Sequence, residues 1–325
     1  MGRAESEPIL VEDFESAEVG GIPEGFEQQG LVQVVDDVAH TGKKSLRIEP
    51  RRDGMRRINL RGEKVEALGG SHWGRIYFKV QLPHPLPPTP EPGQRPGVVH
   101  STIVGGTAKS PYVTNPVEQS DADSAETATS DEPNRERPAR ERSAANQSAE
   151  RQSADRQSAE GTNAGDDANR EERRRRRREG RGQRARDIDE PPFGNIEVRV
   201  VDTVMRGDGK HQYLYNVQPR DGRREYASGS SYDYEYTDDW TLAEWYVDFE
   251  TQSYRFWVNG EEIERIALNG GPGNYRRIEI PAQFDMLFFG WWNYQPVEEG
   301  FTVWLDDIAI GKERLGPVKT AESAK

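Results

Sequence analysis

The residues of this chain that could do chemistry are basic, amide and aromatic side chains set along predicted β-strands. His100 and Arg199 each lie in the middle of a predicted strand, and Tyr213 and Tyr215 share one face of a third. The sequence has no GxxxxGK(S/T), GxGxxG, HExxH or GxSxG motif, and its five histidines are not at metal-ligand spacing. What remains is a set of aromatics, amides, acids and a few basic groups, which favours chemistry on a carbohydrate.

A predicted hairpin at residues 245–260 (WYVDFETQSYRFWVNG) is the strongest signal for the elements that must position these residues. Apolar residues alternate with other residues along both halves, with a polar turn at Thr251-Gln252-Ser253. A period of two is typical of half-buried antiparallel strands. Asn259-Gly260 supplies the positive-φ pair that a tight reversal needs. We expect the rest of the core to pack on this hairpin.

Other strands are predicted at residues 9–16, 32–35, 46–48, 73–82, 98–104, 196–204, 212–218, 278–280, 286–292 and 301–310. Residues 83–96 are proline-rich and predict an irregular connection, and residues 228–239 predict a loop. No amphipathic helix and no βαβ rhythm is present. The pattern predicts an all-β fold, an antiparallel two-sheet sandwich of jelly-roll (concanavalin-like) type. Residues 9–112 and 193–315 would form its single domain, followed by a flexible tail at 316–325.

Between these two parts, residues 113–192 contain no Phe, Tyr or Trp. They hold an imperfect repeat around Gln-Ser-Ala-Glu and an arginine run, Arg173 to Arg178. Such a segment buries too little apolar surface to offset its ordering cost, so we predict a disordered low-complexity insertion. The arginines are either a solvated stretch or a contact for RNA, an anionic polymer or a membrane surface. The acidic residues around the run favour the solvated stretch.

The composition restricts the partners of the chain. Its net charge of −13 disfavours attraction to nucleic acid, so no nucleic-acid partner is expected. No run of about 18 apolar residues exists, so no membrane span is predicted, and no signal peptide is visible at the start. The absence of cysteine excludes disulfides and thiolate metal sites. We expect a monomer.

Several segments resemble the family of jelly-roll proteins typified by a cellulose-induced fungal glucuronan lyase and its bacterial relatives. The matching segments are 11–16 (VEDFES), 40–43 (HTGK), 73–75 (WGR), 99–101 (VHS), 197–200 (EVRV), 212–216 (QYLYN) and 304–308 (WLDDI). They cover nearly everything except the insertion. The resemblance implies a secreted protein, located outside the cell or in the periplasm, with a polysaccharide as substrate or ligand.

The resemblance also implies a structural calcium ion. In many sugar-binding jelly rolls, an acidic residue of the first strand meets an aspartate of the last strand, and carbonyls of a glycine turn complete the oxygen shell. The corresponding residues here are Glu15, Asp306 and the turn from His40 to Lys43. Alternatively, Asp306 and Asp307 only solvate a strand end.

The lyase chemistry that the resemblance implies is β-elimination from a uronic acid. It needs the carboxylate neutralised, the C5 proton removed and the leaving oxygen protonated. Arg199 suits the first task, and His100 and Tyr215 suit the two proton transfers. Gln212, Tyr213, Gln218, Trp292 and Tyr294 are the predicted substrate-binding residues.

Each of these assignments has a structural alternative. His100 could be a satisfied structural histidine, Arg199 could form an ordinary cross-strand ion pair, and the Trp291–Tyr294 aromatics could belong partly to the core. In a regular strand Tyr215 and Gln218 lie on opposite faces unless a bulge intervenes. Three functions therefore stand: a polysaccharide lyase, a non-catalytic carbohydrate-binding module, and an interaction protein that acts through the arginine-bearing insertion.

Overall fold

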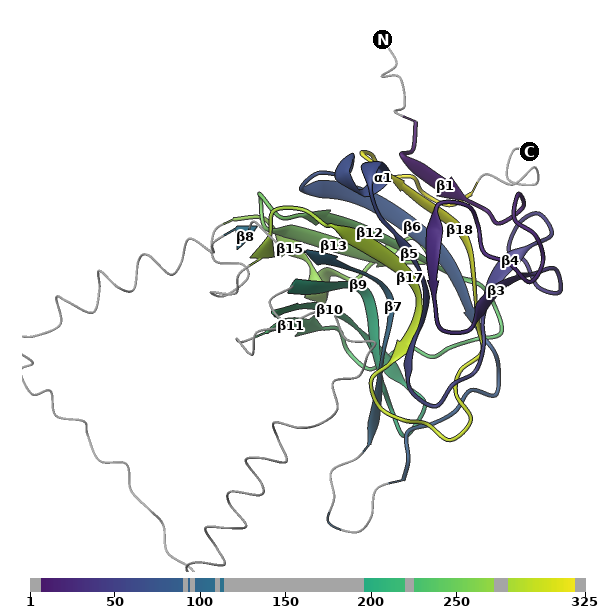
Figure 1. The fold of residues 1–325 in the computed structure, drawn as a ribbon. Helices are drawn as coiled ribbons and strands as arrows, with labels where there is room; N and C mark the ends of the chain where they lie inside the picture. The colour runs from purple at the N-terminus through teal and green to yellow at the C-terminus, as the bar shows by residue number, and fades with distance from the viewer. Residues whose placement is uncertain are drawn as a thin grey trace, which may run out of the picture. The chain divides into compact units, whose positions relative to one another are not determined.

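The computed structural model describes residues 7–89, 93, 97–108, 112–113, 196–219, 225–271 and 280–318. In these residues it contains eighteen β-strands, one short α-helix, α1 (Glu63–Glu66), and one 3-10 helix, η1 (Glu264–Ile266). The strands form two large antiparallel sheets and one small pair, so the predicted all-β, two-sheet fold is confirmed (Figure 1). The predicted insertion 113–192, apart from Val113, and the predicted tail beyond residue 318 lie outside the described residues.

The first sheet has nine strands. Along its main path they are β14 (Glu261–Glu262), β13 (Ser253–Val258), β12 (Thr241–Asp248), β6 (Ser71–Val80), β18 (Val303–Gly311), β4 (Ser45–Ile48) and β3 (Val32–Val35). β1 (Leu10–Glu12) also pairs with β18, and β15 (Leu268–Asn269) with β13.

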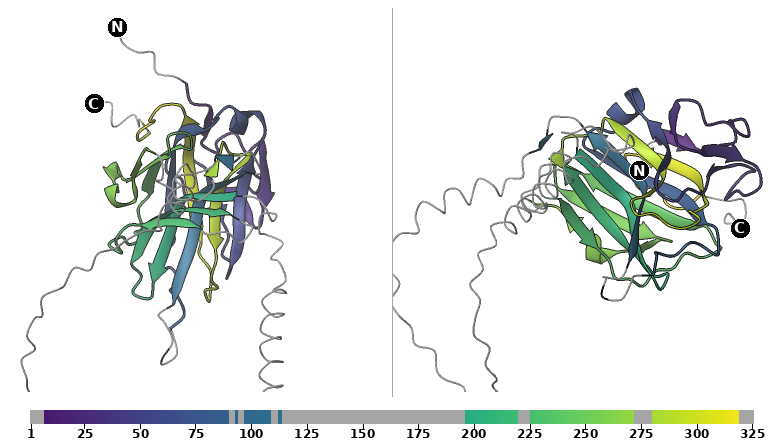
Figure 2. Two further views of the ribbon diagram at one scale, coloured as in Figure 1. Left: turned by 90° about the vertical axis from the view of Figure 1, so that its left-hand side faces the viewer. Right: turned by 60° about the horizontal axis from the view of Figure 1, so that its bottom comes forward.

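The second sheet has seven strands, in the order β11 (Tyr226–Gly229), β10 (His211–Pro219), β9 (Ile196–Arg206), β7 (Val98–Ala108), β17 (Met286–Asn293), β5 (Gly54–Leu60) and β2 (Phe26–Gln29). β7 and β9 come from opposite sides of segment 113–192 and are direct neighbours in this sheet. β8 (Tyr112–Val113) and β16 (Ile280–Pro281) form the separate pair. The two large sheets stack on one another in both views of Figure 2.

The predicted hairpin is β12 and β13, joined in the register Trp245↔Phe256. Trp245, Val247 and Phe256 are buried, while Tyr246 and Asp248 are partly exposed, as the alternation predicted. Asn259 and Gly260 have φ of 50° and 84°, which confirms the positive-φ pair. The hairpin is held in the nine-stranded sheet by β6, where Gly74 lies opposite Trp245.

The core between the two sheets is aromatic and aliphatic. Tyr254 of β13 stacks on Tyr215 of β10, with ring centroids 3.8 Å apart and planes within 9°. The Tyr254 hydroxyl also donates a hydrogen bond to the Val200 carbonyl of β9, at 2.7 Å. These contacts join the predicted hairpin to the opposite sheet, since β13 belongs to the nine-stranded sheet and both β9 and β10 belong to the seven-stranded sheet.

Six of the observed strands were not predicted from the sequence; four of them are short (β8, β11, β14 and β15), and the other two are β2 and β5. β5 carries Arg56 and Arg57 in the middle of its seven residues, which breaks the apolar alternation. Arg56 is nevertheless fully buried, because its guanidinium donates to the carbonyls of Glu49 and Phe301 and to Asn293 Oδ1. A buried arginine is tolerated where such acceptors surround it.

Candidate active site on the seven-stranded sheet

One side of the seven-stranded sheet packs on the core, and the other side bears a connected group of polar and aromatic residues. We call this group the polar face. Its members are His100 and Thr102 of β7, Glu197, Arg199 and Asp202 of β9, Gln218 of β10, and Trp292 and Tyr294 at the end of β17.

A β-bulge in β9 brings the polar residues of this strand to one side. Arg199 lies opposite Asn216 of β10, and Asp202 lies opposite Leu214. Two residues of β9 separate the first pair from the second, but only Tyr215 separates them on β10. The extra residue shifts the alternation, so Asp202 lies on the same side as Arg199 despite a spacing of three.

His100 is held by a buried carboxylate. Its Nε2 lies 2.6 Å from Asp202 Oδ2, and the hydroxyl of Thr102 donates to Asp202 Oδ1 at 2.7 Å. Asp202 is fully buried, whereas 16% of the His100 side chain is exposed. An ionised carboxylate accepts the Nε2–H, which leaves Nδ1 of a neutral ring with a free lone pair. The contact with Asp202 therefore favours the tautomer that a general base needs.

Arg199 is held by a second buried carboxylate. Its Nε donates to Glu197 Oε1 at 2.7 Å, and its terminal nitrogen donates to Gln218 Oε1. Burial would lower the pKa of Arg199, but the nearby Tyr294, Glu197 and Asp202 raise it above its ordinary value. The guanidinium is therefore permanently charged. These two contacts use two of its five N–H donors, and 5% of the side chain is exposed.

Tyr294 connects the two carboxylates. Its hydroxyl donates to Glu197 Oε1 at 3.0 Å and lies 3.1 Å from the Thr102 hydroxyl. Its ring lies 4.7 Å from the ring of His100 and 4.0 Å from the guanidinium carbon of Arg199. Burial raises the pKa of Tyr294 well above its ordinary value, although Arg199 opposes this shift. The phenol therefore keeps its proton at neutral pH.

Trp292 extends the polar face away from His100. Its ring lies 4.1 Å from that of Tyr294, and the guanidinium carbon of Arg57 lies 6.0 Å from it. The same guanidinium lies 4.2 Å over the ring of Phe288. This side of the polar face therefore combines buried aromatic rings with a second, buried cation.

The structure brings together five of the eight predicted catalytic and substrate-binding residues: His100, Arg199, Gln218, Trp292 and Tyr294. Gln212 lies on the same side of β10 as Gln218, and its side chain bonds to Tyr232. Tyr213 and Tyr215 are different. They are 3% and 0% exposed and point into the core. The tyrosine beside His100 and Arg199 is Tyr294, so the predicted catalytic position of Tyr215 is corrected to the core.

The predicted calcium ligands do meet at one turn, at residues 40–44. Glu15 Oε1 accepts the backbone N–H groups of Lys43 and Lys44 at 2.6 and 2.7 Å. Asp306 Oδ2 accepts the backbone N–H of His40 at 2.7 Å. The turn thus links a residue just after β1 to the last strand.

This arrangement does not fit a calcium ion. The turn presents N–H groups to both carboxylates, whereas Ca²⁺ requires oxygen ligands, six to eight of them. Asp307, next to Asp306, is bound to His40 Nδ1 at 2.6 Å and to the Thr41 hydroxyl. In the part of the chain that the structure describes, no group of three or more acidic or histidine side chains could hold a metal ion.

Sequence reasoning missed Glu197 and Asp202, the two carboxylates that hold the site. Glu197 could have been found, since a strand spacing of two places it beside Arg199. Asp202 could not, because the spacing of three from Arg199 predicts opposite faces and the bulge is not visible in the sequence.

No protein-family model matches the chain, and no curated protein sequence matches it. Among solved structures it is similar to an endo-β-1,4-glucuronan lyase from the fungus Trichoderma reesei, with 12% identity, 94% of this chain and 96% of that chain covered, and a TM-score of 0.44. It is also similar to the alginate lyase Aly36B, with 8% identity, 96% and 100% coverage and a TM-score of 0.44. A third similar structure is the receptor-binding domain of botulinum neurotoxin mosaic serotype C/D. Its identity to this chain is 10%, the match covers 95% of this chain and 48% of that chain, and the TM-score is 0.41.

At identities and TM-scores this low, these likenesses do not bear on what the chain binds or cleaves. None of the helices in the described residues is long and apolar enough to cross a membrane.

Proposed function

We propose that the polar face is the active site of a polysaccharide lyase that cleaves a uronic-acid polymer, such as a glucuronan, by β-elimination. One observation carries the proposal. Arg199, His100 and Tyr294 supply a fixed cation, a base and a proton donor, and two buried carboxylates hold them in one network. These are the three groups that elimination from a uronic acid requires.

In the proposed reaction, Arg199 binds the uronate carboxylate and stabilises the negative charge that develops on it as the C5–H bond breaks. His100 Nδ1 takes the C5 proton, and the electron pair forms the C4–C5 double bond. The C4–O bond breaks, and the glycosidic oxygen takes the proton of Tyr294. His100 then releases its proton to solvent and Tyr294 regains one, so the step is balanced.

The environment of each group supports its role. Asp202 keeps the His100 proton on Nε2 and stabilises the imidazolium that forms after proton abstraction. The Arg199 guanidinium, 4.0 Å from the Tyr294 ring, stabilises the phenolate left after proton donation. Tyr294 is partly exposed beside His100, whereas Trp292 is 5% exposed and packs behind it.

The test is an ultraviolet assay for the unsaturated uronate product on a panel of glucuronan, alginate and polygalacturonate. We expect product from at least one polymer. Polymer binding without any unsaturated product would contradict the proposal and favour a carbohydrate-binding module.

Tyr294→Phe tests the assigned proton donor, since it removes the hydroxyl and keeps the ring. We expect turnover to fall by about 10²–10⁴ with little change in polymer affinity. The matched control is Tyr246→Phe on the nine-stranded sheet, where the hydroxyl is likewise bound to a carboxylate, that of Asp248 at 3.0 Å. Equal losses in the two variants would contradict a catalytic role for Tyr294.

Export and a monomeric state stay predictions of the sequence.

A further inference from the structure

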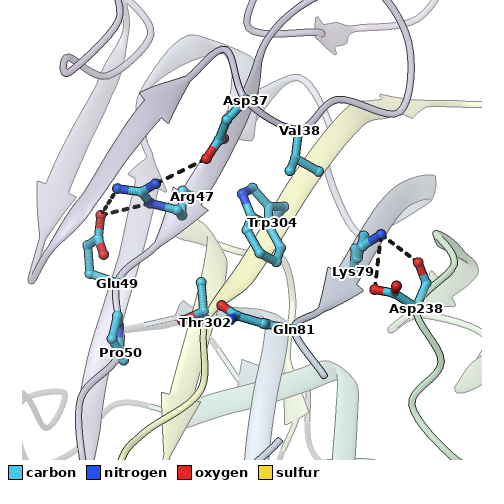
Figure 3. A pocket seen from close by; sticks show the side chains of 10 residues that line it. All are labelled: Asp37, Val38, Arg47, Glu49, Pro50, Lys79, Gln81, Asp238, Thr302 and Trp304. Carbon is cyan, nitrogen blue, oxygen red and sulfur yellow. Dashed lines mark hydrogen bonds and ion pairs between the residues drawn. The ribbon is translucent and has the colours of Figure 1, made fainter. Parts of the chain in front are cut away.

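A hollow lies on the outer side of the nine-stranded sheet, separate from the polar face. Its volume is about 590 Å³, within the range of small-molecule sites. β3, β4, β6 and β18 surround it, and Trp304 of β18 lies at its centre (Figure 3). The register of the sheet places Trp304 opposite Arg47 of β4 on one side and Lys79 of β6 on the other.

Trp304 has an unpaired hydrogen-bond donor. The side chain is only 8% exposed, and its Nε1–H has no hydrogen-bond partner among the described residues. In Figure 3 this nitrogen lies on the edge of the indole that faces Asp37 and Arg47. A buried donor without an acceptor is unfavourable, and an oxygen of a ligand that reached this edge of the indole would supply the missing acceptor.

The charged groups of the hollow are already paired. Arg47 bonds to Glu49 at 2.6 Å and to Asp37 at 3.3 Å. Lys79 bonds to the carboxylate of Asp238 at 3.3 Å. Two cations thus face three carboxylates, so an anionic ligand would meet an excess of negative charge.

The uncommitted groups are neutral. Besides the Trp304 N–H, they are the side-chain amide of Gln81, which is exposed, and the hydroxyl of Thr302, which is partly exposed. Val38 and Pro50 add apolar surface to the wall. An aromatic ring beside amide, hydroxyl and paired charged groups is complementary to a ligand with many hydroxyls, which both donate and accept hydrogen bonds.

We propose that this hollow is a second carbohydrate-binding site, which takes a neutral pyranose sugar against Trp304. It does not depend on the proposed lyase activity, because it lies on the other sheet and selects against a uronate. A chain with both sites would bind neutral sugar units of a polymer on one sheet and acidic units on the other.

The experiment is saturation-transfer NMR of the full chain with cellohexaose, mannohexaose and xylohexaose, with a glucuronate oligomer of equal length as the anionic probe. We expect at least one neutral oligosaccharide to bind. We expect Trp304→Phe, which keeps a ring and removes the N–H, to weaken this binding about five- to tenfold. Trp73→Phe is the matched control, since Trp73 lies on the same sheet and stacks on Trp257 at 5.3 Å outside the hollow.

Thermal melting of both variants is measured in parallel. Trp304→Phe should melt close to the wild type, because the substitution removes an unpaired donor. If Trp304→Phe fails to fold, Thr302→Val is the second probe of the hollow. The proposal is overturned if no neutral oligosaccharide binds, if both tryptophan variants weaken binding equally, or if the glucuronate oligomer is the ligand that Trp304→Phe loses.

Discussion

Replacing His211 by phenylalanine should remove part of the acid sensitivity of the fold. His211 is 1% exposed at the start of β10, and neither ring nitrogen has a hydrogen-bond partner among the described residues. Its ring stacks on that of Tyr236 at 4.2 Å. Burial, with a smaller contribution from His84, lowers the pKa of His211 to about 3.

The magnitude follows from linkage between protonation and folding. The unfolded chain binds a proton on this histidine below its ordinary pKa of about 6.5, whereas the folded chain does not until about pH 3. Stability is therefore fully present above about pH 6.5 and is lost as the pH falls toward 3. At pH 5 the loss is about 2 kcal/mol, which corresponds to roughly 4–8 °C in melting temperature for a domain of this size.

The assay is thermal unfolding of the wild type and His211→Phe at pH 8 and pH 5. Phenylalanine keeps the stack on Tyr236 and cannot titrate, so the variant should lose about 2 kcal/mol less between the two pH values. His72, which burial also gives a pKa of about 3, and Asp306, which burial gives a pKa of about 7, are present in both proteins, so their contributions cancel. An identical pH dependence in both proteins would refute the reasoning.

Three further predictions concern other parts of the molecule. Asp202→Asn should lower lyase turnover about a thousandfold or more with little change in KM, because the amide can donate to His100 Nε2 and move the ring proton to Nδ1. Unchanged turnover would show that this tautomer is not needed for the reaction. EDTA should leave the melting temperature unchanged, since backbone N–H groups already satisfy the predicted calcium ligands. A clear drop in melting temperature with EDTA would instead support a bound calcium ion. Gly74→Ala should destabilise the fold by about 1–3 kcal/mol or more in chemical denaturation, because the added Cβ would lie 2.1 Å from Trp245 Cζ2. Gly207→Ala is the control, since a Cβ at that position meets no atom within 4 Å.

The parts of the fold that the sequence predicted are those set by local patterning. The β12–β13 hairpin follows from alternation, and the reversal from β13 into β14 follows from Asn259-Gly260; both signals act within a few residues. β5 was missed because the burial of Arg56 depends on carbonyls that come from residues as far away as Phe301. A pattern of apolar residues cannot report acceptors that only the folded chain supplies.

The same distinction applies to the candidate site. His100 and Arg199 were found because basic residues in the middle of strands are conspicuous. The sequence points to Tyr215 and not Tyr294, because Tyr215 shares one face of a predicted strand with Tyr213 and lies in a segment that carries the family resemblance. Tyr294 reaches the site from β17, which pairs with β7 and not with β10. Which strands are neighbours is a property of the whole sheet, so the sequence could not decide between the two tyrosines.

The position of β18 affects how the chain can fold as it is made. This last strand is not at an edge, for it lies between β6 on one side and β4 and β1 on the other. Synthesis proceeds from the N-terminus at roughly 5–20 residues per second, so β1, β4 and β6 leave the ribosome well before their shared partner. Until Val303–Gly311 arrives, these three strands expose unpaired backbone groups that favour aggregation. The nine-stranded sheet is therefore completed only after Val303–Gly311 has been synthesised, and until then the earlier strands of a nascent chain are open to pairing with neighbouring chains.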